Sequence, residues 1–155
     1  MSINRPLGSD IDVRHVPIDG TNYILAAGTT DVDSSAIDLS GFNDAVIIMT
    51  VGVIASSGDV TANLAHSDNG TDWDDIADSS ISLSADTDDD KMLRWNLFRP
   101  TKRYVRVETV RGDGGNSTIN GIHAILSGAR SLPITPVYTA GQHEAVVDIV
   151  DPVDA

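Results

Sequence analysis

The chain has 155 residues and carries 10 Lys and Arg against 23 Asp and Glu, for a formal net charge of -13. This length predicts one domain with a sizeable core. The acidic balance argues against a nucleic-acid partner, because phosphate binding needs a basic surface. The absence of cysteine excludes disulfides and thiolate chemistry. No apolar run approaches the roughly 18 residues of a membrane span and no signal-peptide core opens the chain, so we expect a soluble protein or part of a soluble assembly, with no membrane partner.

The acidic residues themselves carry structural information. Only 2 of them are Glu and 21 are Asp. Asp favours turns, caps and loops, whereas Glu is tolerated inside helices. No stretch combines helical periodicity with caps at both ends, so we expect very little helix.

Period-two alternation, β-branched residues and turn residues predict eight or nine short strands. Their expected bounds are residues 22–27, 35–39, 44–54, 59–67, 74–77, 79–84, 91–98, 102–110 and 118–127. Strands at this spacing predict an all-β protein, an antiparallel β-sandwich with a jelly-roll-like topology.

Two of these strands indicate how their faces are used. In the strand at 102–110, Tyr104 and Arg106 alternate with Val105 and Val107, so one face is expected in the core and the other outside it. The run Val46-Ile47-Ile48-Met49 is apolar on both faces, which predicts a central strand or one covered by a neighbouring chain.

Both ends of the chain differ from its middle. Five of the six prolines lie in residues 1–20 and 131–155, where no pairing register is visible. We therefore expect an N-terminal arm at 1–20, a sandwich domain at 21–132 and an extended C-terminal arm at 133–155. Such arms are expected to contact neighbouring protein chains in an assembly.

Charge is also segregated along the chain. Between Arg14 and Lys91 there are 15 Asp and no Lys or Arg, and seven cations then fall between Lys91 and Arg111. One interpretation is that acidic and basic surfaces bind each other across subunits, and the other is solvated loops with internal ion pairs. On the first interpretation, the candidate interface residues are Arg94, Arg99, Lys102, Arg103, Arg106, Pro133, Pro136 and Tyr138.

Signatures of catalysis are missing from the sequence. The four histidines are far apart and form no HxH or HExxH pattern, and there is no GxSxG or GxxxxGK[ST]. We therefore expect no catalytic residues and no enzyme activity.

One acidic loop suggests a cation. Asp86, Asp88 and Asp90 alternate in it, and calcium is bound by several such oxygens at about 2.3 to 2.6 Å. Lys91 stands where an EF-hand requires glycine, so this is not that motif. The loop is either a calcium site of another kind or a solvated acidic loop, and no other cofactor is expected.

A hairpin at Ser67–Trp73, with an Asn-Gly turn, is followed some thirty residues later by the strand Arg103-Tyr104-Val105-Arg106-Val107. Together with Ala27-Gly28-Thr29 and the strand end at 38–42, these motifs resemble small jelly-roll virion proteins of tailed bacteriophages, including capsid decoration or cement proteins. The resemblance covers about residues 24–133. It implies a place on the capsid surface and contacts with the major capsid protein and with copies of itself, with a homotrimer as one arrangement.

The same motifs also resemble discoidin-like carbohydrate-binding sandwiches. This chain departs from them in lacking cysteine and in having only two tryptophans, Trp73 and Trp95. We expect Trp73 and Tyr104 to anchor the core. The leading hypothesis is thus a phage capsid protein, with a tail or neck position also open, and the alternative is a glycan-binding module assisted by calcium. An open pocket rimmed by Trp, Asp and Asn would favour the alternative.

Overall fold

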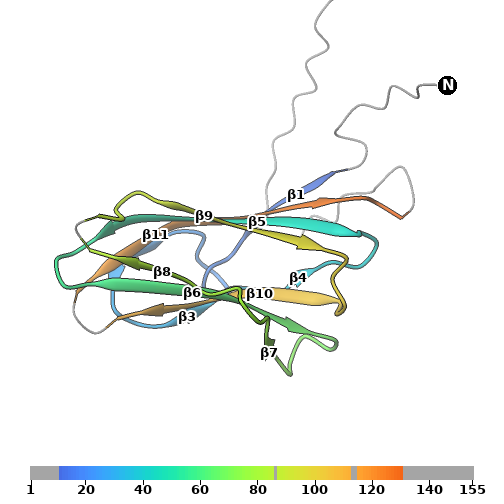
Figure 1. Cartoon of the computed structure of the whole chain (residues 1–155), viewed down its shortest axis with the longest axis horizontal. Coiled ribbons are helices and arrows are strands. Elements are labelled where there is room, and N and C mark those ends of the chain that lie inside the picture. Colours follow the sequence, from blue (N-terminus) through green and yellow to red (C-terminus); the bar gives the residue numbers. More distant parts are fainter. Residues whose placement is uncertain (1–10, 86, 113–114, 131–155) are drawn as a thin grey trace, which may run out of the picture.

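A computed structural model describes residues 11–85, 87–112 and 115–130. The described residues form eleven strands and no helix. All the strands pair antiparallel, and they make two sheets that stack face to face (Figure 1). The protein is therefore an all-β sandwich of jelly-roll-like layering, as the strand spacing predicts.

The first sheet, sheet A, is built on two long neighbouring strands. They are β5 (Asp44–Ile54) and β11 (Ser117–Ser127), and the sheet order is β1-β11-β5-β9 with β2 also on β11. The remaining strands of sheet A are β1 (Asp12–Val16), β2 (Leu25–Gly28) and β9 (Met92–Phe98).

The second sheet, sheet B, is built on β6 (Asp59–Ser67) and β10 (Tyr104–Arg111). Its order is β3-β10-β6-β7, with β4 also on β10 and β8 also on β6. The shorter strands are β3 (Val32–Asp33), β4 (Ile37–Asp38), β7 (Asp74–Asp75) and β8 (Ile81–Ser84).

The core lies between the sheets and is filled by the inward positions of the long strands. Ile47, Met49, Leu64, Val105 and Val107 are all at most 1% exposed. Strand β5 lies between β11 and β9, which confirms its predicted central position. The predicted alternation along β10 is confirmed as well, because Val105 and Val107 are buried whereas Tyr104 and Arg106 are half-exposed.

The expectation that Trp73 and Tyr104 anchor the core is wrong. Tyr104 points away from the core, as the alternation of β10 requires, and Trp73 stacks under the guanidinium of Arg106 at 4.5 Å on the same outer face. Trp95 is the core tryptophan: it is 7% exposed, and its indole N–H donates to the Ser79 carbonyl at 2.6 Å.

The N-terminal boundary expected at residue 20 is also wrong. Strand β1 pairs with β11, and Val16 and Ile18 belong to the core. The inward positions of β1 hold Asp12 and Arg14, which form an ion pair at 2.8 Å, so the strand lacks the apolar alternation that marks the others. The C-terminal arm expected at 133–155 lies outside the described residues.

Candidate protein interface

The outer face of sheet A carries a group of apolar side chains, and Arg94 and Asn96 lie beside them on β9. The pairing register places Val13, Ile125 and Val46 in one row across β1, β11 and β5, and it places Ile48 in the next row. Val13 is 37% exposed and the others are half-buried. A sheet face in contact with water normally alternates to polar residues, so this face has the composition of one that packs against another surface.

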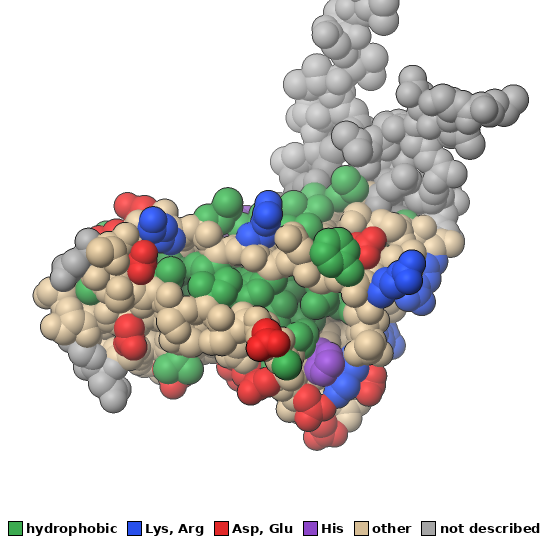
Figure 2. All heavy atoms as spheres, in the orientation of Figure 1, with side chains coloured by type: hydrophobic (Ala, Val, Ile, Leu, Met, Phe, Trp, Pro, Cys, Tyr) green, Lys and Arg blue, Asp and Glu red, His purple; other side chains and the backbone are tan. Residues whose placement is uncertain are grey.

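Two larger apolar side chains extend this face at the β9 edge. Met92 is 63% exposed and Phe98 is 76% exposed, and both belong to the outward set of β9. Figure 2 views the sandwich from its β9 edge and shows hydrophobic side chains in the seam between the two sheets, next to this face and not on it. We call Val13, Val46, Ile48, Ile125, Met92 and Phe98 the sheet A face.

A pair of histidines lies on the same side. His15 of β1 and His123 of β11 are opposite each other in the register and stack with centroids 4.6 Å apart, while Tyr23 lies 4.4 Å from His15. Burial lowers the pKa of His15, and the neighbouring His123 lowers it further. No sequence motif marks this pair, because the two histidines meet only through the pairing of β1 with β11.

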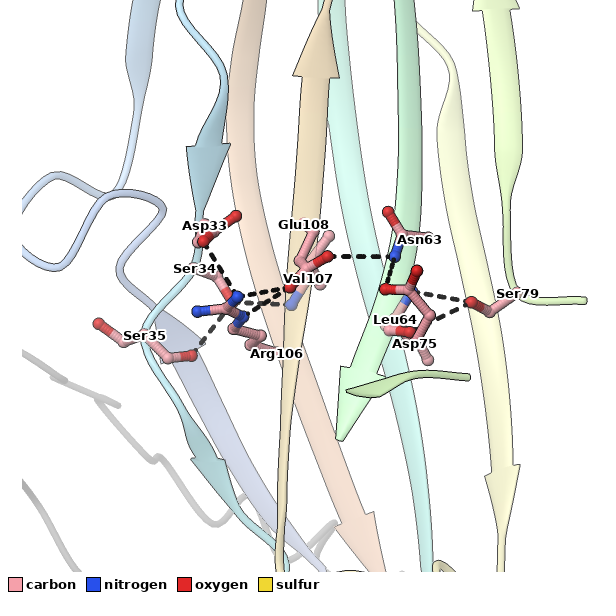
Figure 3. A network of polar contacts seen from close by, with 10 residues as sticks. All are labelled: Asp33, Ser34, Ser35, Asn63, Leu64, Asp75, Ser79, Arg106, Val107 and Glu108. Atoms are coloured by element: carbon pink, nitrogen blue, oxygen red, sulfur yellow. Dashed lines mark hydrogen bonds and ion pairs between the residues drawn. The ribbon is translucent and has the colours of Figure 1, made fainter. Parts of the chain in front are cut away.

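The outer face of sheet B has the opposite character. A polar network runs across β3, β10, β6 and β7 (Figure 3). Arg106 bonds to Glu108 at 2.5 Å and to Asp33 at 3.2 Å, and the Asn63 amide donates to Glu108 at 3.3 Å and to Asp75 at 3.1 Å. The polar groups of this face are thus paired with one another within the chain.

The aromatic rings of the sheet B face are also covered from one side. Arg106 lies over Trp73 at 4.5 Å and Arg103 lies over Tyr104 at 4.8 Å. Gly70 also lies next to the Tyr104 ring. These contacts leave less ring surface for a flat ligand.

Three of the five basic residues predicted at an interface form ion pairs within their own chain. Lys102 bonds to Asp74, Arg103 bonds to Asp38 at 2.7 Å, and Arg106 belongs to the network just described. The Arg103 guanidinium is the main cause that holds the pKa of Asp38 at about 2. Of the five predicted cations, Arg94 and Arg99 form no ion pair with any residue that the structure describes.

Two hollows lie at the end of the sandwich formed by the β4–β5 and β9–β10 loops. One measures about 310 Å³ and includes Lys102, Arg103 and Arg130, and the other measures about 170 Å³ and includes Leu97, Phe98 and Arg99. Neither is lined by Trp73, Asp or Asn, so neither is the pocket that a glycan module was expected to show.

Two aspartates of the acidic loop before β9 accept hydrogen bonds from backbone N–H groups. Asp88 accepts a bond from the Ser84 N–H at 3.1 Å, and Asp89 accepts one from the Ile54 N–H at 2.8 Å. Asp90 takes a left-handed backbone conformation with φ of 57°. Asp86 lies outside the described residues, and those that are described contain no cluster of three or more possible metal ligands.

The remaining candidate residues, Pro133, Pro136 and Tyr138, also fall outside the described part of the chain. Within that part, no helix is long and apolar enough for a membrane crossing.

No protein-family model matches the chain, and no curated protein matches it. Among solved structures, it is similar to the PBSX exported protein XepA at 14% identity and a TM-score of 0.48, with 97% of this chain and 47% of that chain covered. A CBM4 structure matches at 10% identity and a TM-score of 0.46, with coverage of 82% and 93%. Tobacco streak virus coat protein matches at 14% identity and a TM-score of 0.37, with coverage of 88% and 96%. This chain thus spans about half the length of the first of these proteins, and the likenesses concern the fold alone.

Proposed function

We propose that this chain is a structural protein of a phage virion, most specifically a capsid decoration or cement protein that binds the shell through the sheet A face. It acts by contact and catalyses no reaction. Its partners are the capsid shell and copies of itself.

The observation that carries the proposal is the contrast between the two outer faces. The sheet A face presents apolar side chains from β1, β11, β5 and β9, whereas the polar groups of the sheet B face are bonded to one another. Burial of apolar area is the main source of affinity in protein association, at about 25 cal/mol per Å² removed from water. The resemblance to virion proteins of tailed bacteriophages supports the same partner class.

The proposal is tested by attachment of purified variants to particles that lack the protein. Ile48→Lys places a charge in the centre of the sheet A face, and its aliphatic stem can lie along that face, so the fold should be kept. Ser82→Lys, on exposed β8 of sheet B, is the matched control. Ile48→Lys should lose attachment while Ser82→Lys keeps it.

Equal attachment of the two variants would contradict the assignment of the sheet A face. A mass-spectrometric inventory of purified particles tests the position. Hundreds of copies per particle support capsid decoration, whereas a dozen or fewer indicate a tail or neck protein.

A glycan-binding module is the second candidate, and one observation favours it. Trp73 lies on the outer face of sheet B and not in the core, under Arg106 of the polar network that includes Glu108 and Asn63. Binding to a glycan array that is abolished by Trp73→Ala, while the variant stays folded, would support this candidate. Absence of binding by the parent chain to such an array would exclude it for the glycans tested.

A further inference from the structure

Strand β9 differs from the other edges of the sandwich. β1 and β2 share one side of β11, β3 and β4 share one side of β10, and β7 and β8 share one side of β6. These edges are therefore broken into pieces of two to five residues, whereas β9 is one strand of seven residues. Its register with β5 is continuous, with no bulge. Short, interrupted edges resist pairing with another chain, and a long regular edge invites it.

The backbone groups that β9 offers can be read from its hydrogen bonds. The Lys91 carbonyl accepts a bond from the Val51 N–H at 2.9 Å, and the Arg99 N–H donates to the Asn43 carbonyl at 2.8 Å. Because bonding alternates along an antiparallel strand, the odd-numbered residues bond to β5. The N–H and C=O groups of the four even-numbered residues point outward, and no described residue bonds to them. They belong to Met92, Arg94, Asn96 and Phe98.

The side chains of this edge are apolar at its two ends. Met92 and Phe98 are among the most exposed large hydrophobic residues of the described chain. Partly buried Leu97, Ile81 and Leu83 pack against the core from β9 and from β8, an edge strand of the other sheet. A chain docked on β9 would cover this apolar seam as well as the outward backbone groups.

We propose that a second copy of this chain pairs with β9 through its own β9, antiparallel, about a two-fold axis that passes at Trp95. In this alignment Met92 lies opposite Phe98 of the second copy, and Arg94 lies opposite Asn96. All four outward residues of each copy then make backbone bonds to the partner. A shift by two residues leaves some of them unpaired and sets Arg94 against Arg94 or Asn96 against Asn96.

Charge at the two ends of β9 fits the same alignment. The loop before β9 carries Asp88, Asp89 and Asp90, and the loop after it carries Arg99, Lys102 and Arg103. An antiparallel partner brings its basic loop beside this acidic loop, and the two-fold axis repeats the contact. Arg99, which forms no ion pair with the described residues of its own chain, would lie opposite Lys91 and one position from Asp90 of the second copy. Asp88, Asp89 and Asp90 outnumber Lys91, so the net charges of the facing loops favour this orientation over a parallel one.

The pairing is self-complementary, so it closes at two copies. It goes beyond the proposed function, since the dimer uses the edge of sheet A and forms whether or not the sheet A face binds a capsid. The two ideas fail separately, because Ile48→Lys changes the face at a distance from the edge, and a cross-link between Arg94→Cys and Asn96→Cys chains reports the edge alone. Met92 and Phe98 belong to both surfaces.

The first test is sedimentation velocity on the full chain from micromolar to millimolar concentration. We expect a monomer–dimer equilibrium whose dissociation constant rises at least tenfold in the double variant Met92→Lys, Phe98→Lys. The matched control is Val110→Lys, which changes an exposed hydrophobic residue, 50% exposed, on β10. A chain that stays monomeric throughout, a trimer, or a dimer that the double variant leaves intact would overturn the proposal.

The second test reads the alignment directly. The chain has no cysteine, so an introduced cysteine is unique. Opposed residues in a bonded antiparallel pair have Cα atoms about 5.5 Å apart, within the reach of a disulfide. A mixture of Arg94→Cys and Asn96→Cys chains should therefore cross-link to each other on mild oxidation. Each variant alone should not, and efficient self-linking of either one would show a different alignment and overturn the proposal.

Discussion

At the scale of single residues, one buried polar side chain, that of Arg111, connects separate segments of the sandwich. Arg111 is 6% exposed, and its guanidinium donates to the carbonyl groups of Thr30, Ala26 and Ser117 at 2.7, 3.2 and 3.1 Å. Burial lowers the pKa of Arg111. One side chain therefore ties the β2–β3 region to the start of β11, in an environment where each unpaired carbonyl would cost free energy.

We expect Arg111→Met to reduce the free energy of unfolding by about 3 kcal/mol, because it leaves buried carbonyl groups without donors. Arg94→Met, at an exposed position, should change it by no more than about 0.5 kcal/mol. Urea denaturation followed by circular dichroism measures both values. Equal stabilities would show that water or a relaxed backbone replaces the guanidinium.

The two tryptophans should differ sharply. Trp95→Ala removes a core side chain and its bond to Ser79, so it should cost about 3 to 5 kcal/mol. Trp73→Ala removes a surface contact with Arg106, and the loss should be about 1 kcal/mol. Thermal melting of the two variants distinguishes them. A larger loss of stability in Trp73→Ala than in Trp95→Ala would contradict the assignment of Trp95 to the core.

At the scale of elements, the N-terminal segment is part of the sandwich. β1 pairs with β11 over five residues, Arg14 donates to the Asp38 carbonyl at 2.9 Å, and Ile18 is fully buried just after the strand. This segment therefore joins sheet A to the β4 region of sheet B. Removal of residues 1–20 would take this packing away, so the domain is not expected to keep its stability without them.

A single substitution tests this role of the segment. Ile18→Ala should cost about 2 to 5 kcal/mol, the usual range for a buried Ile, while Ile24→Ala, 65% exposed, should be nearly neutral. Chemical denaturation gives the comparison. If Ile18→Ala left the free energy of unfolding unchanged, the segment would be an arm that does not contribute to the stability of the domain.

The junction of β1 and β11 should also respond to pH. The pKa of His15 is lowered in the folded chain from its usual 6.5, mainly by burial, so the unfolded chain binds the proton more readily. Stability should therefore be complete above about pH 6.5 and fall as the pH drops through that value toward the folded pKa. Denaturation at pH 7.5 and pH 5 should show a smaller difference for His15→Leu than for the parent chain. His66→Gln is the control, and the same reduction in it would contradict the assignment to His15.

At the scale of the whole molecule, the formal charge of -13 coexists with cations that are mostly committed to internal pairs. Lys102, Arg103 and Arg106 stabilise contacts within the chain, while Arg94 and Arg99 have no ion pair among the described residues. The interpretation of internal ion pairs is thus confirmed for Lys102, Arg103 and Arg106, and an interface role for Arg94 and Arg99 stays a prediction.

Charge reversal should separate these two groups. Arg103→Glu breaks the pair with Asp38 and should lower the free energy of unfolding only slightly, since the Arg103 side chain is 53% exposed. Arg99→Glu should leave stability unchanged and weaken association between chains, with a reduced dependence on salt. Thermal melting and sedimentation at low and high salt measure the two effects. An unchanged salt dependence in Arg99→Glu would show that Arg99 is solvated in the assembly.

The sequence by itself determined the fold class and most of the strands. The bounds predicted for β5 and β6 are those observed, and the inward and outward faces of β10 were correct. Period-two alternation made this possible, because it follows from the local geometry of a strand that is buried on one face. Asp-rich turns likewise mark strand ends through local backbone preferences.

Tertiary structure decided what depends on strand pairing. Strand β1 was missed because its inward positions hold the Asp12–Arg14 ion pair, and Trp73 was misplaced because its side chain covers the outside of sheet B. The stacking of His15 on His123 and the position of β9 at an edge likewise follow from which strands pair, not from their own residues. Local alternation tells which face of a strand is buried, but the neighbours of that strand are chosen by contacts distant in the sequence. Those contacts determine which side chains meet and which edge stays open to another molecule.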